Sequence, residues 1–214
     1  MNSRKRNVQI VLAAFALTVS VAGVVSSARA EGIGAQNEVS ISGGAQVLNQ
    51  NDTALPDHFV NVPAVATLTH NLNSRLAFEG EFTWMIPVQQ NVEISPGTTQ
   101  DVKNPDVLAY QANVRASFPA ANLTPYIVAG AGAATFLSTT DPDRVPQLEN
   151  SQTVFAANFG AGLLYNLAEH WAVRADGREF VAFPQDGTAG LSSADGTADP
   201  IWMERGTLGL TYRF

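Results

Sequence analysis

Apolar and polar residues alternate with the two-residue period of a β-strand in one segment after another, from Glu31 to the end of the chain. Each segment ends in turn residues, and glycine is frequent inside the segments, which disfavours helix. No stretch after Ala30 shows a sustained apolar period of 3.6 residues. The pattern predicts strands over residues 38–48, 59–70, 74–86, 106–118, 123–137, 151–165, 170–183 and 201–214.

The connections between these strands alternate in length. Residues 71–73, 119–122 and 166–169 are short, whereas the long ones are 49–58, 87–105, 138–150 and 184–200. In an up-and-down barrel this order puts every long connection at one rim, and the short turns with both termini at the other, which is the layout of barrels in bacterial outer membranes. The predicted fold class is therefore all-β, an eight-stranded antiparallel up-and-down transmembrane β-barrel.

The two faces of each predicted strand differ in chemistry. Along residues 74–86, one face carries Phe78, Phe82 and Trp84, and the other carries Glu79 and Glu81. The interior of eight strands is barely wide enough for side chains, so these aromatic residues would overfill it. We therefore predict that aromatic side chains face lipid and that charged and small side chains face the lumen.

The charges of the predicted strands balance in number, as expected for a confined polar core in which an unpaired charge is costly. Six are basic and six are acidic: Arg75, Arg115, Arg174, Arg178, Arg205 and Arg213, against Glu38, Glu79, Glu81, Asp176, Glu179 and Glu204. The predicted lumen charge network consists of Arg75, Glu79, Glu81, Arg115, Arg174, Asp176, Arg178 and Arg205. Centring each hairpin on its loop puts Glu79 across from Arg115, and Asp176 near Arg205. We interpret the network as a structural plug, with a selective ion path as the alternative.

Two carboxylates do not fit this division. Strict alternation puts Glu179 and Glu204 on the lipid face, near strand ends where the penalty for acidic groups is small. A bulge after Gly177 would instead turn Glu179 inward and Phe180 outward. The sequence leaves both arrangements open.

The first thirty residues have the organisation of a secretory signal. Arg4, Lys5 and Arg6 precede an apolar run over 10–25, and the small residues of an A-x-A cleavage site occupy 28–30. An uncleaved inner-membrane anchor is the alternative, but the run is shorter than the roughly 20 residues needed to span a membrane. We predict a cleaved signal peptide over residues 1–30 and one barrel domain over residues 31–214.

Composition narrows the possible partners. Four of the 12 basic residues lie in the predicted signal, which leaves eight against 19 acidic residues and a net charge of −11. This balance argues against nucleic acid as a partner. The chain has no cysteine, so it has no disulfide and no thiolate metal site.

Acidic residues dominate the predicted loops. They are Asp52, Asp57, Glu93, Asp101, Asp106, Asp141, Asp143, Glu149, Asp186, Asp195 and Asp199, against the basic residues Lys103 and Arg144. The simplest interpretation is a solvated loop surface. The alternative is a rim that attracts cations, or binds divalent ions close to anionic lipopolysaccharide.

Candidate catalytic and metal-binding residues are few. The acidic segment 141–143 lacks the continuation of a calcium-binding loop. His58 could be combined with Ser192 or Ser193 in a surface hydrolase, but no spacing supports that site. We therefore expect no cofactor, no metal ion and no enzymatic activity.

The last predicted strand has an unusual aromatic end. Its alternating apolar face consists of Leu208, Leu210, Tyr212 and Phe214. This ending resembles the C-terminal assembly signal of bacterial outer-membrane barrels. The resemblance implies recognition by the barrel-assembly machinery.

Other segments extend the resemblance over the predicted mature chain. Residues 124–126 lead into Gly130-Ala131-Gly132, and 159–163 and 171–176 have comparable motifs. The chain resembles the small outer-membrane β-barrel family typified by the transmembrane domain of OmpA and by OmpX, although these motifs describe barrel packing and not activity. The resemblance implies a location in the bacterial outer membrane, in contact with outer-membrane lipid and lipopolysaccharide.

The expected function is a structural or surface-interaction role through long extracellular loops, whose partner the sequence does not identify. A narrow porin-like channel for small solutes or ions is the alternative. An outer-membrane lipid-modifying enzyme is a more distant one.

Overall fold

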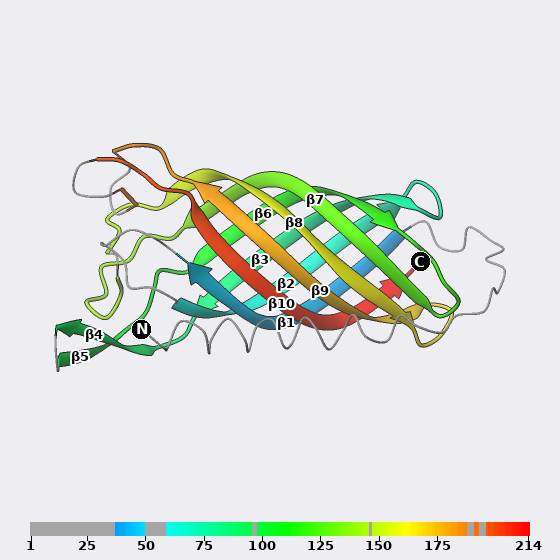
Figure 1. The fold of residues 1–214 in the computed structure, drawn as a ribbon, viewed down its shortest axis with the longest axis horizontal. Coiled ribbons are helices and arrows are strands. Elements are labelled where there is room, and N and C mark those ends of the chain that lie inside the picture. The colour runs from blue at the N-terminus through cyan, green and yellow to red at the C-terminus, as the bar shows by residue number, and fades with distance from the viewer. Residues whose placement is uncertain (1–36, 50–58, 96–97, 146, 188–190, 193–195) are drawn as a thin grey trace, which may run out of the picture.

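Eight strands close into one antiparallel barrel in the computed structural model, which describes residues 37–49, 59–95, 98–145, 147–187, 191–192 and 196–214. Around the barrel the order is β1-β10-β9-β8-β7-β6-β3-β2, and β1 also pairs with β2 (Figure 1). The predicted fold class is confirmed. The barrel strands are β1 (Asn37–Asn49), β2 (Phe59–Asn71), β3 (Leu76–Pro87), β6 (Val107–Ser117), β7 (Leu123–Phe136), β8 (Gln152–Asn166), β9 (Trp171–Phe183) and β10 (Ile201–Arg213).

The connections sort to the two ends of the barrel as their lengths predict. We call the rim with the long connections the loop end and the rim with the short ones the turn end (Figure 1). One long connection, expected to be a loop over 87–105, contains a hairpin of β4 (Gln90–Ser95) and β5 (Thr98–Val102). This hairpin forms a separate two-stranded sheet and projects from the loop end (Figure 1).

Several sequence predictions fall outside the described residues. These are the signal peptide over residues 1–30 and the loop residues Asp52, Asp57, His58, Ser193 and Asp195. The signal peptide and its cleavage therefore stay predictions. The described part of the chain includes no helix long and apolar enough to cross a membrane.

Strand alternation produces two chemically distinct surfaces. Outward positions such as Phe78, Phe159 and Leu208 are exposed on the barrel wall, and the intervening positions are buried in the lumen. The register between β9 and β10 has no break, since Gly177 pairs with Gly206 and Glu179 with Glu204. No bulge turns Glu179 inward, so both carboxylates lie on the outer face.

The prediction that aromatic residues face only lipid is wrong for part of the lumen. Phe59, Phe136, Phe180 and Tyr126 are all buried at inward positions. Small inward residues on other strands make room for them. Gly162 is the clearest case, because a Cβ atom there would overlap the Tyr126 hydroxyl.

Candidate functional site: the barrel lumen

Charged side chains fill the half of the lumen nearer the turn end, and Glu79 of β3 lies at their centre. Its Oε2 accepts a hydrogen bond from Arg174 Nη1 at 2.8 Å, and its Oε1 accepts one from Arg178 Nη2 at 2.7 Å. Thr69 and Asn113 donate weaker hydrogen bonds of 3.3 Å to the same carboxylate. Both oxygens of this buried carboxylate are thus hydrogen-bonded, as burial of a charge requires.

Asp176 of β9 is the second carboxylate of this group. It accepts hydrogen bonds from Arg178 Nε at 2.7 Å, from Arg174 Nη2 at 3.2 Å and from the Tyr126 hydroxyl at 2.6 Å. Arg205 Nη2 lies 3.5 Å away. The Tyr126 ring also packs against the Arg174 guanidinium, 5.2 Å from the ring centroid, which is within the range of a cation–π contact.

Glu81 of β3 completes the group and binds the guanidinium of Arg205 in a two-pronged arrangement. Arg205 Nη1 and Nη2 lie 2.8 Å and 3.1 Å from the two carboxylate oxygens. Arg178 Nη1 is 3.0 Å from Glu81 Oε2, but without the angle of a hydrogen bond, so this contact is an ion pair only. Paired guanidinium and carboxylate planes are the strongest form of this interaction.

A second, smaller group of ion pairs lies closer to the turn end than the central group. Glu38 of β1 pairs with Arg115 of β6 at 2.8 Å and with Arg213 of β10 at 3.1 Å. Arg115 also donates to Asn71 Oδ1, and Arg213 to Asn166 Oδ1. Two arginines therefore share a single carboxylate at this level.

The structure brings most of the predicted lumen charge network together, with two corrections. Arg75 is exposed in the turn before β3 and does not reach the lumen, because the strand begins one residue later, at Leu76. The predicted partner of Glu79 is wrong, since Arg115 pairs with Glu38 and not with Glu79. Buried together are Glu79, Glu81, Arg115, Arg174, Asp176, Arg178 and Arg205.

The alternation predicts inward-facing charges at Glu38 and Arg213 as well, but it does not predict Tyr126 as part of this site. Glu38 and Arg213 occupy inward positions near the chain's first and last strand ends, and Tyr126 occupies an inward position on β7. Their inward parity was readable from the alternation. Tyr126 departs from the prediction because aromatic residues are expected to face lipid, whereas this side chain is buried in the lumen and donates to Asp176.

The half of the lumen nearer the loop end is apolar. Its buried side chains come from all eight barrel strands and pack into one cluster. The inward strand residues of this apolar plug are Leu48, Phe59, Met85, Val107, Ala109, Ala134, Phe136, Val154, Ala156, Phe180, Ala182, Ile201 and Met203.

The loops add to the apolar plug from above. Val102, Leu148 and Leu191, one from each of three long connections, are buried in the same cluster. Backbone hydrogen bonds join two of these connections, from Lys103 N to Asp143 O and from Val145 N to Lys103 O, both at 2.8 Å. These loops therefore fold over the mouth of the barrel and pack on the apolar plug at the loop end.

Two amide side chains interrupt the apolar plug. Gln46 and Asn61 lie opposite each other on β1 and β2, and both are fully buried. The Gln46 amide nitrogen contacts Met85 Sδ at 3.2 Å, whereas its oxygen and both polar atoms of Asn61 have no hydrogen-bond partner among the described residues. Such groups weaken the fold unless water reaches them.

The outer face of the barrel is mostly apolar, with Glu179 and Glu204 as exceptions, and it carries aromatic side chains at both ends. Trp84 and Trp202 lie near the loop end, and Trp171, Tyr212 and Phe214 near the turn end. Tyr212 packs on Trp171, with ring centroids 5.0 Å apart, and on Phe214 at 6.3 Å. Aromatic girdles of this kind mark the two interfaces of a membrane-spanning barrel.

The predicted assembly signal in β10 forms part of this outer face. All four of its residues, Leu208, Leu210, Tyr212 and Phe214, are exposed on the barrel wall. At the end of the chain, backbone hydrogen bonds between Asn37 and Phe214 hold β10 against β1. This strand therefore closes the barrel while keeping its apolar residues outside.

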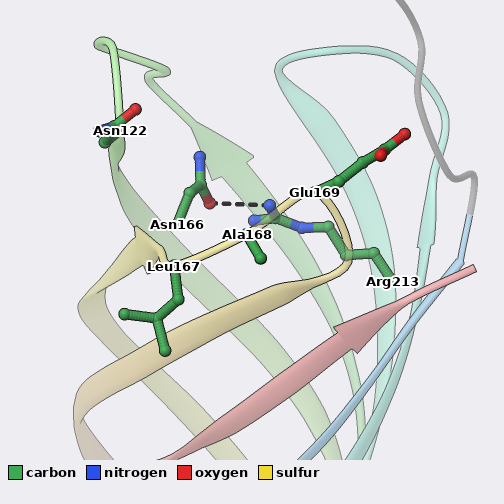
Figure 2. A pocket seen from close by; sticks show the side chains of 6 residues that line it. All are labelled: Asn122, Asn166, Leu167, Ala168, Glu169 and Arg213. Atoms are coloured by element: carbon green, nitrogen blue, oxygen red, sulfur yellow. Dashed lines mark hydrogen bonds between the residues drawn. The ribbon is translucent and has the colours of Figure 1, made fainter.

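A recess of about 330 Å³ opens at the turn end, beside the Glu38 group. Figure 2 shows the Arg213 guanidinium turned toward the Asn166 side chain, with their hydrogen bond of 2.7 Å drawn as a dashed line. The remaining lining residues are Asn122, Leu167, Ala168 and Glu169. Among the described residues, no group of three or more histidine, aspartate or glutamate side chains could hold a metal ion.

An apolar wall with aromatic girdles around a polar and plugged interior defines a membrane-spanning β-barrel. Residues 11–214 match the family described as outer membrane protein beta-barrel domain, and the chain belongs to that family. It is a protein of the bacterial outer membrane. In this layout the loop end faces the outside and the turn end faces the periplasm.

Comparison with solved structures agrees with the fold. The N-terminal β-barrel domain of Pseudomonas aeruginosa OprF aligns with a TM-score of 0.50 and 15% identity, covering 85% of this chain and 99% of that one. Neisserial surface protein A aligns with a TM-score of 0.56 and 11% identity, covering 84% and 97%. At these identities the likeness shows the fold alone. No curated protein sequence matches this chain.

Proposed function

We propose that this protein is a non-conducting outer-membrane barrel with a structural or surface-interaction role through its extracellular loops. The observation that carries the proposal is the filling of the lumen by two successive layers, a balanced ionic group and the apolar plug. A solute would have to break buried ion pairs and then cross an apolar cluster to pass. Both steps are costly for a hydrated ion.

The loops support the surface part of the proposal. They cover the plug and carry most of the acidic side chains, which keep this surface solvated and charged. The apolar outer wall fits outer-membrane lipid and lipopolysaccharide as its surroundings. We infer that the exposed face of β10, from Leu208 to Phe214, is the segment that the barrel-assembly machinery recognises.

Single-channel recording tests the proposal. The protein would be refolded in detergent and added to planar bilayers, with a pore-forming protein as the positive control. We expect no discrete current steps from this chain. Regular steps whose size changes in the Glu79→Gln variant would instead establish the narrow channel, because that variant alters a charge inside the lumen.

Catalysis is not part of the proposed function. His58 is the residue on which a surface hydrolase could be built from the sequence. We expect the His58→Ala variant to leave lipid A and surface substrates unchanged, as measured by mass spectrometry of extracted lipid. A loss of lipid A modification in that variant would contradict the proposal.

A further inference from the structure

The recess at the turn end adjoins a place in the lumen where the charges of the described residues do not balance. The central group pairs three arginines with three carboxylates, but Arg115 and Arg213 share only Glu38 within the described part of the chain. We propose that this recess binds the carboxylate of a small periplasmic molecule, such as the free carboxyl end of a short peptide. The inference goes beyond the proposed function and does not depend on it.

Arg213 is the residue that would contact the ligand. Its side chain lines the recess and is 17% exposed, whereas every arginine of the central group is almost fully buried. The guanidinium is a planar fork of N–H donors that matches the two oxygens of a carboxylate. It is already held in place by Glu38 and Asn166, so binding would require little further ordering.

Two amide side chains supply further donors. Asn166 directs its oxygen toward Arg213, which leaves its amide nitrogen directed away from the guanidinium, and Asn122 lies across the recess (Figure 2). An amide N–H₂ group donates hydrogen bonds, and a carboxylate only accepts them. The arrangement therefore suits an acceptor with two or more oxygens.

The electrostatic field at this level favours an anion. Arg115, which shares Glu38 with Arg213, is 2% exposed, and its Nε and Nη1 have no hydrogen-bond partner among the described residues. Glu169 also lines the recess, but Figure 2 shows its carboxylate pointing away from the Arg213 guanidinium. The group of Arg115, Arg213 and Glu38 thus carries one more positive than negative charge, and Arg213 is its member that lines the recess. An incoming carboxylate would pair with Arg213.

The size of the recess restricts the ligand. A volume of about 330 Å³ is at the lower end of the range of roughly 300 to 1,000 Å³ for small-molecule sites. Leu167 also lines the recess, but it is 58% exposed, and Figure 2 shows its side chain directed away from the Arg213 guanidinium. The chemistry points to a ligand of about dipeptide size with one free carboxylate.

Nuclear magnetic resonance titration of the labelled full-length barrel in micelles tests this site. The probe is N-acetyl-alanyl-alanine, its methyl ester is the uncharged control, and inorganic phosphate is the competing anion. We expect a saturable shift of the Arg213 Nε–H and Asn166 amide signals with the free acid only. In Arg213→Gln the dissociation constant should rise about tenfold, from the loss of hydrogen bonds to a charged group.

A control variant shows whether binding depends on the recess itself or only on positive charge at the turn end. Arg75 lies at the same rim, is exposed and does not line the recess, so Arg75→Gln should bind as the original chain does. Because Arg213 also pairs with Glu38, a second variant, Asn122→Asp, adds a negative charge without removing that pair, and it should weaken binding too. Equal binding of the ester, tighter binding of phosphate, or no saturable shift would overturn the proposal.

Discussion

The two halves of the lumen are built on the same strands but from different chemistry. In the half nearer the turn end, three carboxylates and three arginines form a dense set of ion pairs between β3, β9 and β10. In the half nearer the loop end, apolar residues from all eight strands pack together, and three loop residues join them. In both halves, side chains fill the space between the strands.

The difference shows what each half needs from its surroundings. The central group of the ionic half balances its own charges, three arginines against three carboxylates, and this half has only short turns beside it. The apolar half would expose a large apolar surface at the loop end without Val102, Leu148 and Leu191. The ionic half therefore fixes the strands relative to one another through specific partners, and the apolar half seals the outer mouth through shape and area.

The largest effect should follow from breaking the ionic half at Glu79. In Glu79→Ala, Arg174 and Arg178 each lose a carboxylate while staying buried. We expect the free energy of unfolding to fall by about 3–5 kcal/mol. Urea unfolding in lipid vesicles, followed by tryptophan fluorescence, measures it.

The exposed loop residue Glu149 provides the control for that experiment. Glu149→Ala removes the same charge from a solvated position and should change the unfolding free energy by less than about 0.5 kcal/mol. Equal losses in the two variants would show that the central ion pairs do not hold the barrel together.

A smaller effect is expected where a glycine makes room for the ionic half. A Cβ atom in Gly162→Ala would overlap the Tyr126 hydroxyl, which donates to Asp176. Overpacking of this kind costs about 1–3 kcal/mol. Gly206→Ala is the control because nothing lies within 4 Å of its Cβ position, and the same urea series compares them. If Gly162→Ala were as stable as Gly206→Ala, the packing of Tyr126 would not be tight.

Replacing the buried amide of Asn61 in the apolar half should stabilise the barrel. Asn61→Leu removes two buried polar atoms that have no partner in the described structure. We expect the unfolding free energy to rise by about 1 kcal/mol. Asn113→Leu is the matched control, because that amide donates to Glu79 and should destabilise when removed. Destabilisation by Asn61→Leu would mean that its amide is satisfied by bound water.

Deleting Phe214 should affect stability least, because this residue is 54% exposed and its two backbone hydrogen bonds with Asn37 lie at the end of the long β1–β10 pairing. We expect a small change in unfolding free energy for protein refolded in detergent. The amount assembled in the outer membrane, measured by heat-modifiable gel mobility of membrane fractions, should fall strongly. Equal assembly of the shortened chain would count against the assembly signal.

The alternation in the sequence predicted the barrel strands within a few residues, because one side of a strand in lipid must be apolar and the other side is confined. It also predicted which charged residues face the lumen, apart from Arg75. It could not predict their partners. Glu79 on β3 pairs across the lumen with Arg174 and Arg178 on β9, and β9 is not a neighbour of β3 in the barrel.

The apolar plug was missed for a related reason. The narrow lumen predicts that aromatic residues face lipid, yet Phe180 and Phe136 fit inside, together with the small inward residues Ala109, Ala134 and Ala156. Whether a large side chain fits depends on which residues share its level in the closed barrel. That depends on the register between strands, which strand alternation alone does not supply.

Accessibility of the apolar half tests the sealed lumen most directly. The chain has no cysteine, so Met203→Cys would place one thiol in the plug and Thr140→Cys one on an exposed loop. Whole cells would be treated with a charged thiol reagent that does not cross membranes. We predict that Met203→Cys stays unlabelled over the time that labels Thr140→Cys completely. Labelling of both at similar rates would contradict a sealed outer mouth.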